Sequence, residues 1–280
     1  MKLGIFSKVY KDYELEEAFS KVKAAGLENV QFNFANVGLD SLPSAIPDSV
    51  IKRIKQASDE IGISIPVVSG TFNTLELDDA IHRENIHNFA EVVKAAAKLG
   101  IPCVSISTGS FNQDNFWHSH PENHSEKGWS RLFHSLDEML TIATEHKITI
   151  VVEPEQANVV STVEDMVRLM NHYDNSPYLK VLFDAANMIT PEDANDLEGK
   201  VVDSLTALKD SIAIAHCKDC YVSNEEVDFR AVGMGNLPLG KYLSKLSEFY
   251  DGPVIMHGLE EEEVAYAMEF LNENKECTHG

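Results

Sequence analysis

Basic residues are scarce in this chain of 280 residues. Lysine and arginine number 23 against 45 aspartates and glutamates, which gives a formal net charge of −22 with histidine neutral. A field of that sign repels the phosphates of nucleic acids and of anionic lipids, so we expect neither as a partner. A site that takes an anionic substrate would need a cation of its own.

Cysteines are also few. The four (Cys103, Cys217, Cys220 and Cys277) are too scattered to form a disulfide framework. Cys217 and Cys220 have the spacing of a CxxC motif, but no second pair completes a zinc site. The pair also lacks the helix N-terminal setting of a redox enzyme, so we predict no redox role.

Long apolar runs are missing as well. No stretch approaches the ~20 apolar residues of a membrane span, and Lys8 and Lys11 interrupt the start of the chain. We therefore expect a cytoplasmic protein without a membrane partner. No linker or low-complexity segment divides the sequence, which predicts a single domain over residues 1–280.

What is present is a repeating unit. Three amphipathic patterns of helical period end at Gly26, Gly62 and Gly100, and a short β-branched run follows each. Glycine just past a helix suits the left-handed cap. Gly62 follows Gly26 by 36 residues and Gly100 follows Gly62 by 38, which is the size of one strand–helix unit.

Eight nearly continuous apolar runs have the character of parallel strands buried on both faces. They cover residues 3–7, 29–34, 64–70, 103–109, 149–155, 179–187, 212–219 and 253–259. Helical patterns follow them, among others over 129–146, 163–173, 239–249 and 264–271. Strict alternation eight times over predicts an α/β fold of the (β/α)8 TIM barrel type, with a doubly wound open sheet as the alternative.

Four consecutive runs end in a carboxylate or an imidazole. Glu153 closes the fifth, Asp184 the sixth, His216 the seventh and His257 the eighth. Barrel enzymes place their chemistry at these strand ends, and such groups are costly to bury unless paired or coordinated. We predict that the four bind one divalent metal ion, with Mn²⁺, Co²⁺, Zn²⁺ or Mg²⁺ suited to oxygen and nitrogen ligands. Helix capping, or pairing with Lys218, is the alternative for each carboxylate.

The loop over residues 110–128 is unusually long, and long loops in compact domains are often functional. His118, His120 and His124 accompany Phe116 and Trp117 there. An aromatic platform with hydrogen-bonding groups suits a sugar ring, which makes His118 and His120 candidate substrate contacts. A separate histidine-rich metal site and a solvated loop with incidental histidines are the alternatives.

Other polar residues near predicted strand ends are further candidates for substrate binding. Asn73 follows the third run, and Asn187 lies three residues after Asp184. Lys218 and Arg230 are candidate anchors for a substrate anion. Each of these two cations could instead lie in a surface ion pair.

With Glu153, Asp184, His216 and a further group on the eighth strand, the chain resembles the xylose isomerase-like TIM barrels, the sugar phosphate isomerases and epimerases related to tagatose and psicose 3-epimerases. The segments 69–73 and 117–121 and the Gly233-Met-Gly235 turn are also similar to members of that superfamily. The resemblance covers essentially the whole chain.

The resemblance implies a metal-dependent isomerase or epimerase acting on a sugar, sugar phosphate or related polyol. Glu153 would be both ligand and catalytic base, removing a proton next to a metal-polarised carbonyl or hydroxyl. The sequence departs from the pattern at His257, where the family has glutamate, and at Asn187, where it usually has histidine. Histidine can still bind a metal or move a proton, so His257 is the second catalytic candidate.

Because of these departures, the two-glutamate scheme of 3-epimerases does not transfer intact, and isomerisation or dehydration stays open. A different class is a non-catalytic barrel that binds a sugar or a partner and has lost the strand-eight glutamate. The resemblance also admits apurinic endonucleases, which Asn187 and the charge of −22 disfavour. Family members are often dimers or tetramers, so the resemblance implies a possible homo-oligomer.

Overall fold

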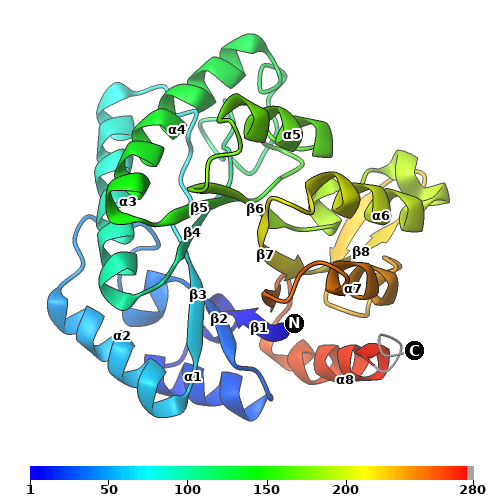
Figure 1. Cartoon of the computed structure of the whole chain (residues 1–280), viewed down its shortest axis with the longest axis horizontal. Helices are drawn as coiled ribbons and strands as arrows, with labels where there is room; N and C mark the ends of the chain where they lie inside the picture. Colours follow the sequence, from blue (N-terminus) through cyan, green and yellow to red (C-terminus); the bar gives the residue numbers. More distant parts are fainter. Residues whose placement is uncertain (276–280) are drawn as a thin grey trace.

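The computed structural model describes residues 1–275, and Cys277 lies outside them. Eight parallel strands close into a barrel in the order β1-β10-β7-β6-β5-β4-β3-β2, which confirms the predicted (β/α)8 architecture (Figure 1). The barrel strands are β1 (Lys2–Phe6), β2 (Asn29–Phe32), β3 (Ser64–Ser69), β4 (Cys103–Ile106), β5 (Thr149–Val152), β6 (Leu179–Phe183), β7 (Ile212–Cys217) and β10 (Pro253–Met256).

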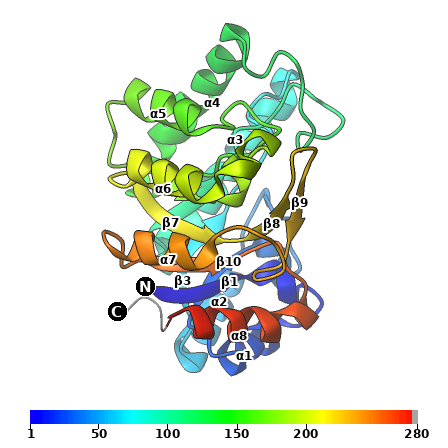
Figure 2. The same ribbon diagram turned by 90° about the vertical axis from the view of Figure 1, so that its right-hand side faces the viewer.

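Eight α-helices of the described residues surround the strands as an outer layer (Figures 1 and 2). They are α1 (Leu15–Ala24), α2 (Asp48–Ile61), α3 (Asp79–Leu99), α4 (Glu126–His146), α5 (Val163–His172), α6 (Leu197–Leu208), α7 (Leu239–Ser247) and α8 (Val264–Lys275). Short 3-10 helices span Ser7–Tyr10, Phe34–Val37, Ala186–Met188, Pro191–Asn195 and Glu261–Glu263. No described helix is long and apolar enough to cross a membrane.

The three glycines that mark the repeating unit take the expected left-handed conformation. Gly62 caps α2 with φ 75° and Gly100 caps α3 with φ 72°. Gly26 follows the end of α1 with φ 81°. A side chain at these φ values would be strained, so glycine lets each helix stop and turn into the next strand.

Apolar side chains fill the inside of the barrel and set the position of the site. One layer consists of Val67, Cys103, Val151, Leu182, Ile214 and Ile255, each from a different strand. Side chains alternate along a strand, so the residue two positions further on points to the same side. Two positions further toward the carboxyl ends of the strands, the same side of the sheet carries Ser69, Ser105, Glu153, Asp184, His216 and His257.

The predicted seventh strand is wrong at its C-terminal end. The run 212–219 was expected to be one strand, but β7 ends at Cys217 and β8 (Asp219–Val222) pairs antiparallel with β9 (Val227–Arg230). This hairpin, which the sequence did not predict, stands beside the barrel in Figure 2. The chain leaves the barrel here because the buried Asp219 carboxylate accepts hydrogen bonds from the backbone N–H groups of Cys220, Gly233, Gly235 and Leu237.

The three described cysteines, Cys103, Cys217 and Cys220, are buried and unpaired. Burial raises the pKa of the Cys220 thiol to about 12. A redox-active CxxC pair needs an accessible thiolate, and this environment disfavours it. Cys217 instead lies at the end of β7, directly after His216.

Candidate metal centre

The four strand-end residues converge at the carboxyl end of the barrel. Glu153, Asp184, His216 and His257 each offer one ligand atom, and these atoms lie within 4.8 Å of one another. Nδ1 of His216 is 3.0 Å from Glu153 Oε1 and 3.5 Å from Asp184 Oδ2. The side chains of His216 and Asp184 are fully buried, and that of Glu153 is 12% exposed.

Two atoms of this cluster have no hydrogen-bond partner although they are buried: Asp184 Oδ2 and His257 Nδ1. The other oxygen of Asp184, Oδ1, accepts a hydrogen bond of 3.0 Å from the backbone N–H of Ala186. An unsatisfied buried polar atom costs about 1–3 kcal/mol, and a metal ion would satisfy both the carboxylate oxygen and the imidazole nitrogen. The cluster therefore fits a divalent ion, without selecting one metal.

The charges of the cluster keep its carboxylates ionised. Burial alone would raise the pKa of Glu153 and Asp184, but the neighbouring basic groups together outweigh it, His216 foremost and Lys218 as well at Asp184. The pKa of Glu153 is lowered and that of Asp184 falls to about 2. Conversely, burial would lower the pKa of His216, but Glu153 and Asp184 raise it to about 9. Without a metal, the one imidazolium thus offsets one of the two carboxylate charges.

His257 is in a different electrostatic position. Burial, followed by the charge of the adjacent His216, lowers its pKa to about 4. Its ring stacks on that of His216 with centroids 4.9 Å apart and an interplanar angle of 17°. At neutral pH the His257 imidazole is therefore uncharged, which is the form that binds metals.

Gln31 of β2 is a member of the site that the sequence analysis missed. Its Oε1 lies 2.7 Å from His216 Nε2, and its Nε2 donates to Ser105 Oγ at 3.4 Å. Both ring nitrogens of His216 therefore have partners, which hold the ring in place. The available signal was the alternation of amide and apolar residues in the run 29–34, where Asn29, Gln31 and Asn33 share one face of the strand.

A chain of two hydrogen bonds connects Lys218, through Asn187, to Glu153 of the candidate metal centre. Lys218 Nζ donates to Asn187 Oδ1 at 2.8 Å, and Asn187 Nδ2 donates to Glu153 Oε1 at 3.2 Å. The Lys218 ammonium also lies 3.7 Å from the centre of the Phe229 ring, on the hairpin that the sequence did not predict. These two residues thus connect to Glu153, and their direct contact with a substrate remains a prediction.

A cavity of about 510 Å³ opens directly on the centre. Glu153, Glu155 and His257 line it together with aromatic residues and small polar side chains. Burial, and then the charge of Glu153, raises the pKa of Glu155 to about 8. The remaining lining residues are Phe6, Lys8, Gln31, Asn33, Ser41, Ser69, Thr71, Ser105, Phe116 and Trp117. The rings of Phe116 and Trp117 lie 4.6 Å apart between centroids.

None of the six predicted substrate contacts is among the residues that line this cavity; besides Asn187 and Lys218, four others lie elsewhere. Arg230 is exposed on β9 and pairs with Asp228. His118 is exposed, and His120 Nδ1 accepts from the backbone N–H of Glu122 at 3.2 Å. Their role in substrate binding remains a prediction, and the loop histidines are not among the metal-type clusters of the described residues.

The fourth predicted contact is Asn73, whose side chain accepts hydrogen bonds from two backbone N–H groups. Its Oδ1 accepts from the N–H groups of Leu75 at 3.2 Å and Ser110 at 3.0 Å. These bonds join the loop after β3 to the loop after β4. Asn73 thereby supports the wall of the site, and direct contact with a substrate remains a prediction.

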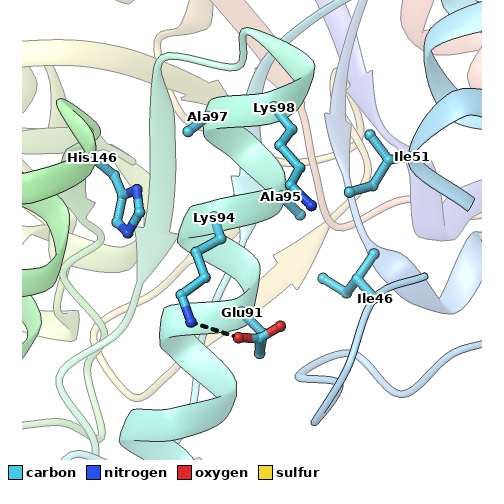
Figure 3. Close-up of a pocket in the computed structure, with 8 residues that line it drawn as sticks. All are labelled: Ile46, Ile51, Glu91, Lys94, Ala95, Ala97, Lys98 and His146. Carbon is cyan, nitrogen blue, oxygen red and sulfur yellow. Dashed lines mark hydrogen bonds and ion pairs between the residues drawn. The ribbon is translucent and has the colours of Figure 1, made fainter. Parts of the chain in front are cut away.

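A second hollow, of about 540 Å³, lies on the outer helices beside α3 and contains none of the predicted site residues (Figure 3). Ile46, Ile51 and Ala95 supply apolar surface there. Its two lysines are already paired, Lys94 with Glu91 and Lys98 with Asp48. This hollow therefore lacks the convergent unsatisfied groups of the barrel centre.

The fold and the cluster at the strand ends define an α/β barrel with a candidate metal centre. Residues 19–274 match the family described as xylose isomerase-like TIM barrel, and the chain belongs to that family. No curated protein matches the sequence significantly.

Solved structures share the fold at low sequence identity. A D-tagatose 3-epimerase-like protein is 19% identical with TM-score 0.77, covering 99% of this chain and 98% of its own. The D-psicose 3-epimerase of Clostridium cellulolyticum H10, solved with D-tagatose, is 17% identical with TM-score 0.76 and full coverage of both chains. The IOLI protein with a bound zinc atom is 17% identical with TM-score 0.69, covering 99% of this chain and 98% of its own.

Proposed function

We propose that this protein is a metal-dependent isomerase or epimerase of a sugar, sugar phosphate or related polyol. The observation that carries the proposal is the convergence of Glu153, Asp184, His216 and His257 on one point, with two buried ligand atoms unsatisfied. The cavity on this point combines small polar side chains with the Phe116 and Trp117 rings, which suits a carbohydrate. The similarity to structures of tagatose and psicose epimerases supports the same reading.

Glu153, Asp184, His216 and His257 would hold the ion. When bound, a divalent ion polarises a sugar carbonyl or hydroxyl and makes the neighbouring C–H more acidic. Glu153 is the proposed base, since its pKa is lowered and it is ionised at neutral pH. His216 and Asn187 both contact Oε1, and no described residue donates to Oε2, so this oxygen is free to take a proton.

His257 is the proposed second proton-transferring group, in the position where the family has glutamate. It lines the cavity, and its uncharged imidazole can accept a proton and return it from the imidazolium so formed. Lys218 and Asn187 are proposed to orient Glu153 and to contact substrate oxygens. The small polar residues of the cavity would bind hydroxyl groups, and the aromatic pair would face the apolar side of the ring.

The alternative is a barrel that binds a sugar or partner without turning it over, since His257 replaces a catalytic glutamate. Glu153→Gln separates the two, because it removes the base while keeping the size of the side chain. An enzyme would lose turnover in this variant, whereas a binding protein would keep its ligand affinity.

The first test is the metal content per chain by elemental analysis of the wild type and Asp184→Ala. We expect about one divalent ion at the barrel centre that is lost in the variant, followed by activity on a panel of ketoses, aldoses and their phosphates. Equal metal content in Asp184→Ala would remove the basis of the proposal. Cytoplasmic location and homo-oligomerisation remain predictions.

A further inference from the structure

A second group of metal-type ligands lies on the outer helical layer. His82 of α3 and His134 and Glu138 of α4 each offer one ligand atom, and these atoms lie within 4.8 Å of one another. The two helices are neighbours in the ring, as Figure 1 shows. None of the three residues belongs to the barrel centre or lines its cavity.

All three side chains belong to α-helices. His134 and Glu138 are four residues apart on α4 and so lie on one face of the helix, one turn apart. His82 lies in the first turns of α3, where the Asp78 side chain caps the backbone N–H groups of Ala80 and Ile81. Because both helices pack against the barrel, the cluster does not depend on a loop.

The two distances from the Glu138 carboxylate to the histidine nitrogens fit a small tetrahedral ion. Glu138 Oε1 lies 3.1 Å from His82 Nε2 and 3.5 Å from His134 Nε2. Zinc bonds of ~2.0–2.1 Å place neighbouring ligand atoms of a tetrahedron roughly 3.3–3.4 Å apart. The two imidazole rings stack with centroids 5.7 Å apart and an angle of 27°. Both nitrogens therefore approach one carboxylate oxygen at the spacing that shared coordination requires.

The cluster is buried on the side of His82 and open to solvent on the side of His134 and Glu138. The His82 side chain is 5% exposed, whereas those of Glu138 and His134 are 41% and 60% exposed. An ion could thus enter from solvent and keep a water as its fourth ligand. His82 is also left with a buried Nδ1 that has no partner in the described residues.

We propose that His82, His134 and Glu138 form a second divalent-metal site, of the class that accepts Zn²⁺. Two imidazoles and one carboxylate suit Zn²⁺, Cu²⁺ or Ni²⁺, whereas Mg²⁺ and Ca²⁺ prefer sites made of oxygen alone. The site has three protein ligands against four in the barrel centre. Ligating histidines normally donate their second N–H to an acceptor, which His82 lacks, so this site binds Zn²⁺ more weakly than the barrel centre.

The test is a Zn²⁺ titration of the metal-stripped full chain against a competing chromophoric chelator. The variants are His134→Ala, which changes an exposed side chain, and Asp184→Ala at the barrel centre, with His87→Ala, an exposed histidine of α3, as the matched histidine control. We expect His134→Ala to lose one zinc equivalent, or to bind it at least ~10-fold more weakly, while His87→Ala matches the wild type. Asp184→Ala should lose a different equivalent, so this proposal and the proposed function fail separately.

Metal selectivity gives a second readout. Co²⁺ bound by the wild type should show the intense visible absorption of tetrahedral coordination at the weaker equivalent, and this signal should be absent in His134→Ala. Mg²⁺ at the same concentration should not displace the ion. The proposal is overturned if His134→Ala has the wild-type zinc isotherm, or if Mg²⁺ competes on equal terms. Either outcome would leave the cluster as a plain carboxylate–histidine hydrogen-bonding group.

Discussion

Lys218 donates a hydrogen bond of 2.8 Å to Asn187 Oδ1, and this single contact connects a buried cation with the metal centre. Asn187 stands where the family resemblance led us to expect histidine, and its amide both accepts from Lys218 and donates to Glu153. Lys218 is only 7% exposed. An ammonium so deeply buried needs its polar partner, which makes the pair a sensitive point of the structure.

We therefore expect Lys218→Met to destabilise the protein by about 1–3 kcal/mol, because it leaves Asn187 Oδ1 buried without a donor. Arg230→Met is the matched control, since this cation is exposed and should change stability by no more than about 0.5 kcal/mol. Urea unfolding of both variants measures the difference. Equal effects would contradict the role given to Lys218.

His257→Glu should change the metal preference of the barrel centre. The substitution replaces a neutral nitrogen ligand with a third carboxylate beside Glu153 and Asp184. Oxygen ligands favour Mn²⁺ and Mg²⁺ over the metals that imidazole suits, so affinity should shift toward those ions. Without metal, the added negative charge should lower the melting temperature. Competition titrations with Mg²⁺ and Zn²⁺ check the first effect, and an unchanged preference would speak against His257 as a ligand.

The metal-free protein should lose stability as the pH rises above neutrality. The pKa of His216 is raised from 6.5 to about 9 in the folded state, so its contribution is complete below 6.5 and disappears as the pH approaches 9. Glu155, whose pKa burial raises to about 8, loses its contribution between 4.5 and 8. The measurement is therefore made in a Glu155→Gln background, which isolates His216.

A bound ion should abolish this dependence, because coordination needs His216 in its uncharged form. Urea unfolding at pH 6.5 and at pH 9, each with chelator and with saturating metal, gives the comparison. We expect stability to fall with pH in chelator and to stay level or rise with metal. The same fall under both conditions would show that the ion does not bind at His216.

Asp219 should be essential for the hairpin β8–β9. Four backbone N–H groups donate to its carboxylate, so Asp219→Ala leaves several buried donors without an acceptor. At about 1–3 kcal/mol for one unsatisfied group, we expect a loss of more than 2 kcal/mol. Asp228→Ala, at a half-exposed carboxylate of the same hairpin, is the control. Hydrogen exchange of residues 219–237 should accelerate only in Asp219→Ala.

The convergence of four polar residues at one end of the barrel was predictable from the sequence because strand periodicity is local. Glu153, Asp184, His216 and His257 each end an apolar run that could only be a buried strand, and parallel strands of one barrel end at one rim. The spacing of Gly26, Gly62 and Gly100 predicted the repeating unit in the same way. These inferences need only the neighbours along the chain.

Contacts between distant segments were not predictable in this way. Gln31 and His216 are 185 residues apart, and only closure of the barrel brings the amide within 2.7 Å of the ring. His82 likewise meets His134 and Glu138 only through the packing of α3 on α4. The pattern of neighbouring residues along the chain does not predict such distances.

Lys218 and Arg230 illustrate the same division. Lys218 directly follows β7 and Arg230 ends β9, and the sequence ranked the two alike as anchors for an anion. The chain leaves the barrel at Asp219, where backbone N–H groups far along the sequence converge on one carboxylate. Lys218 stays buried beside Asn187, while Arg230 is carried out to solvent with Asp228. The sequence alone determined the barrel and the four polar residues at its strand ends. Tertiary hydrogen bonds decided which neighbouring side chains reach these residues, because burial depends on how remote segments pack.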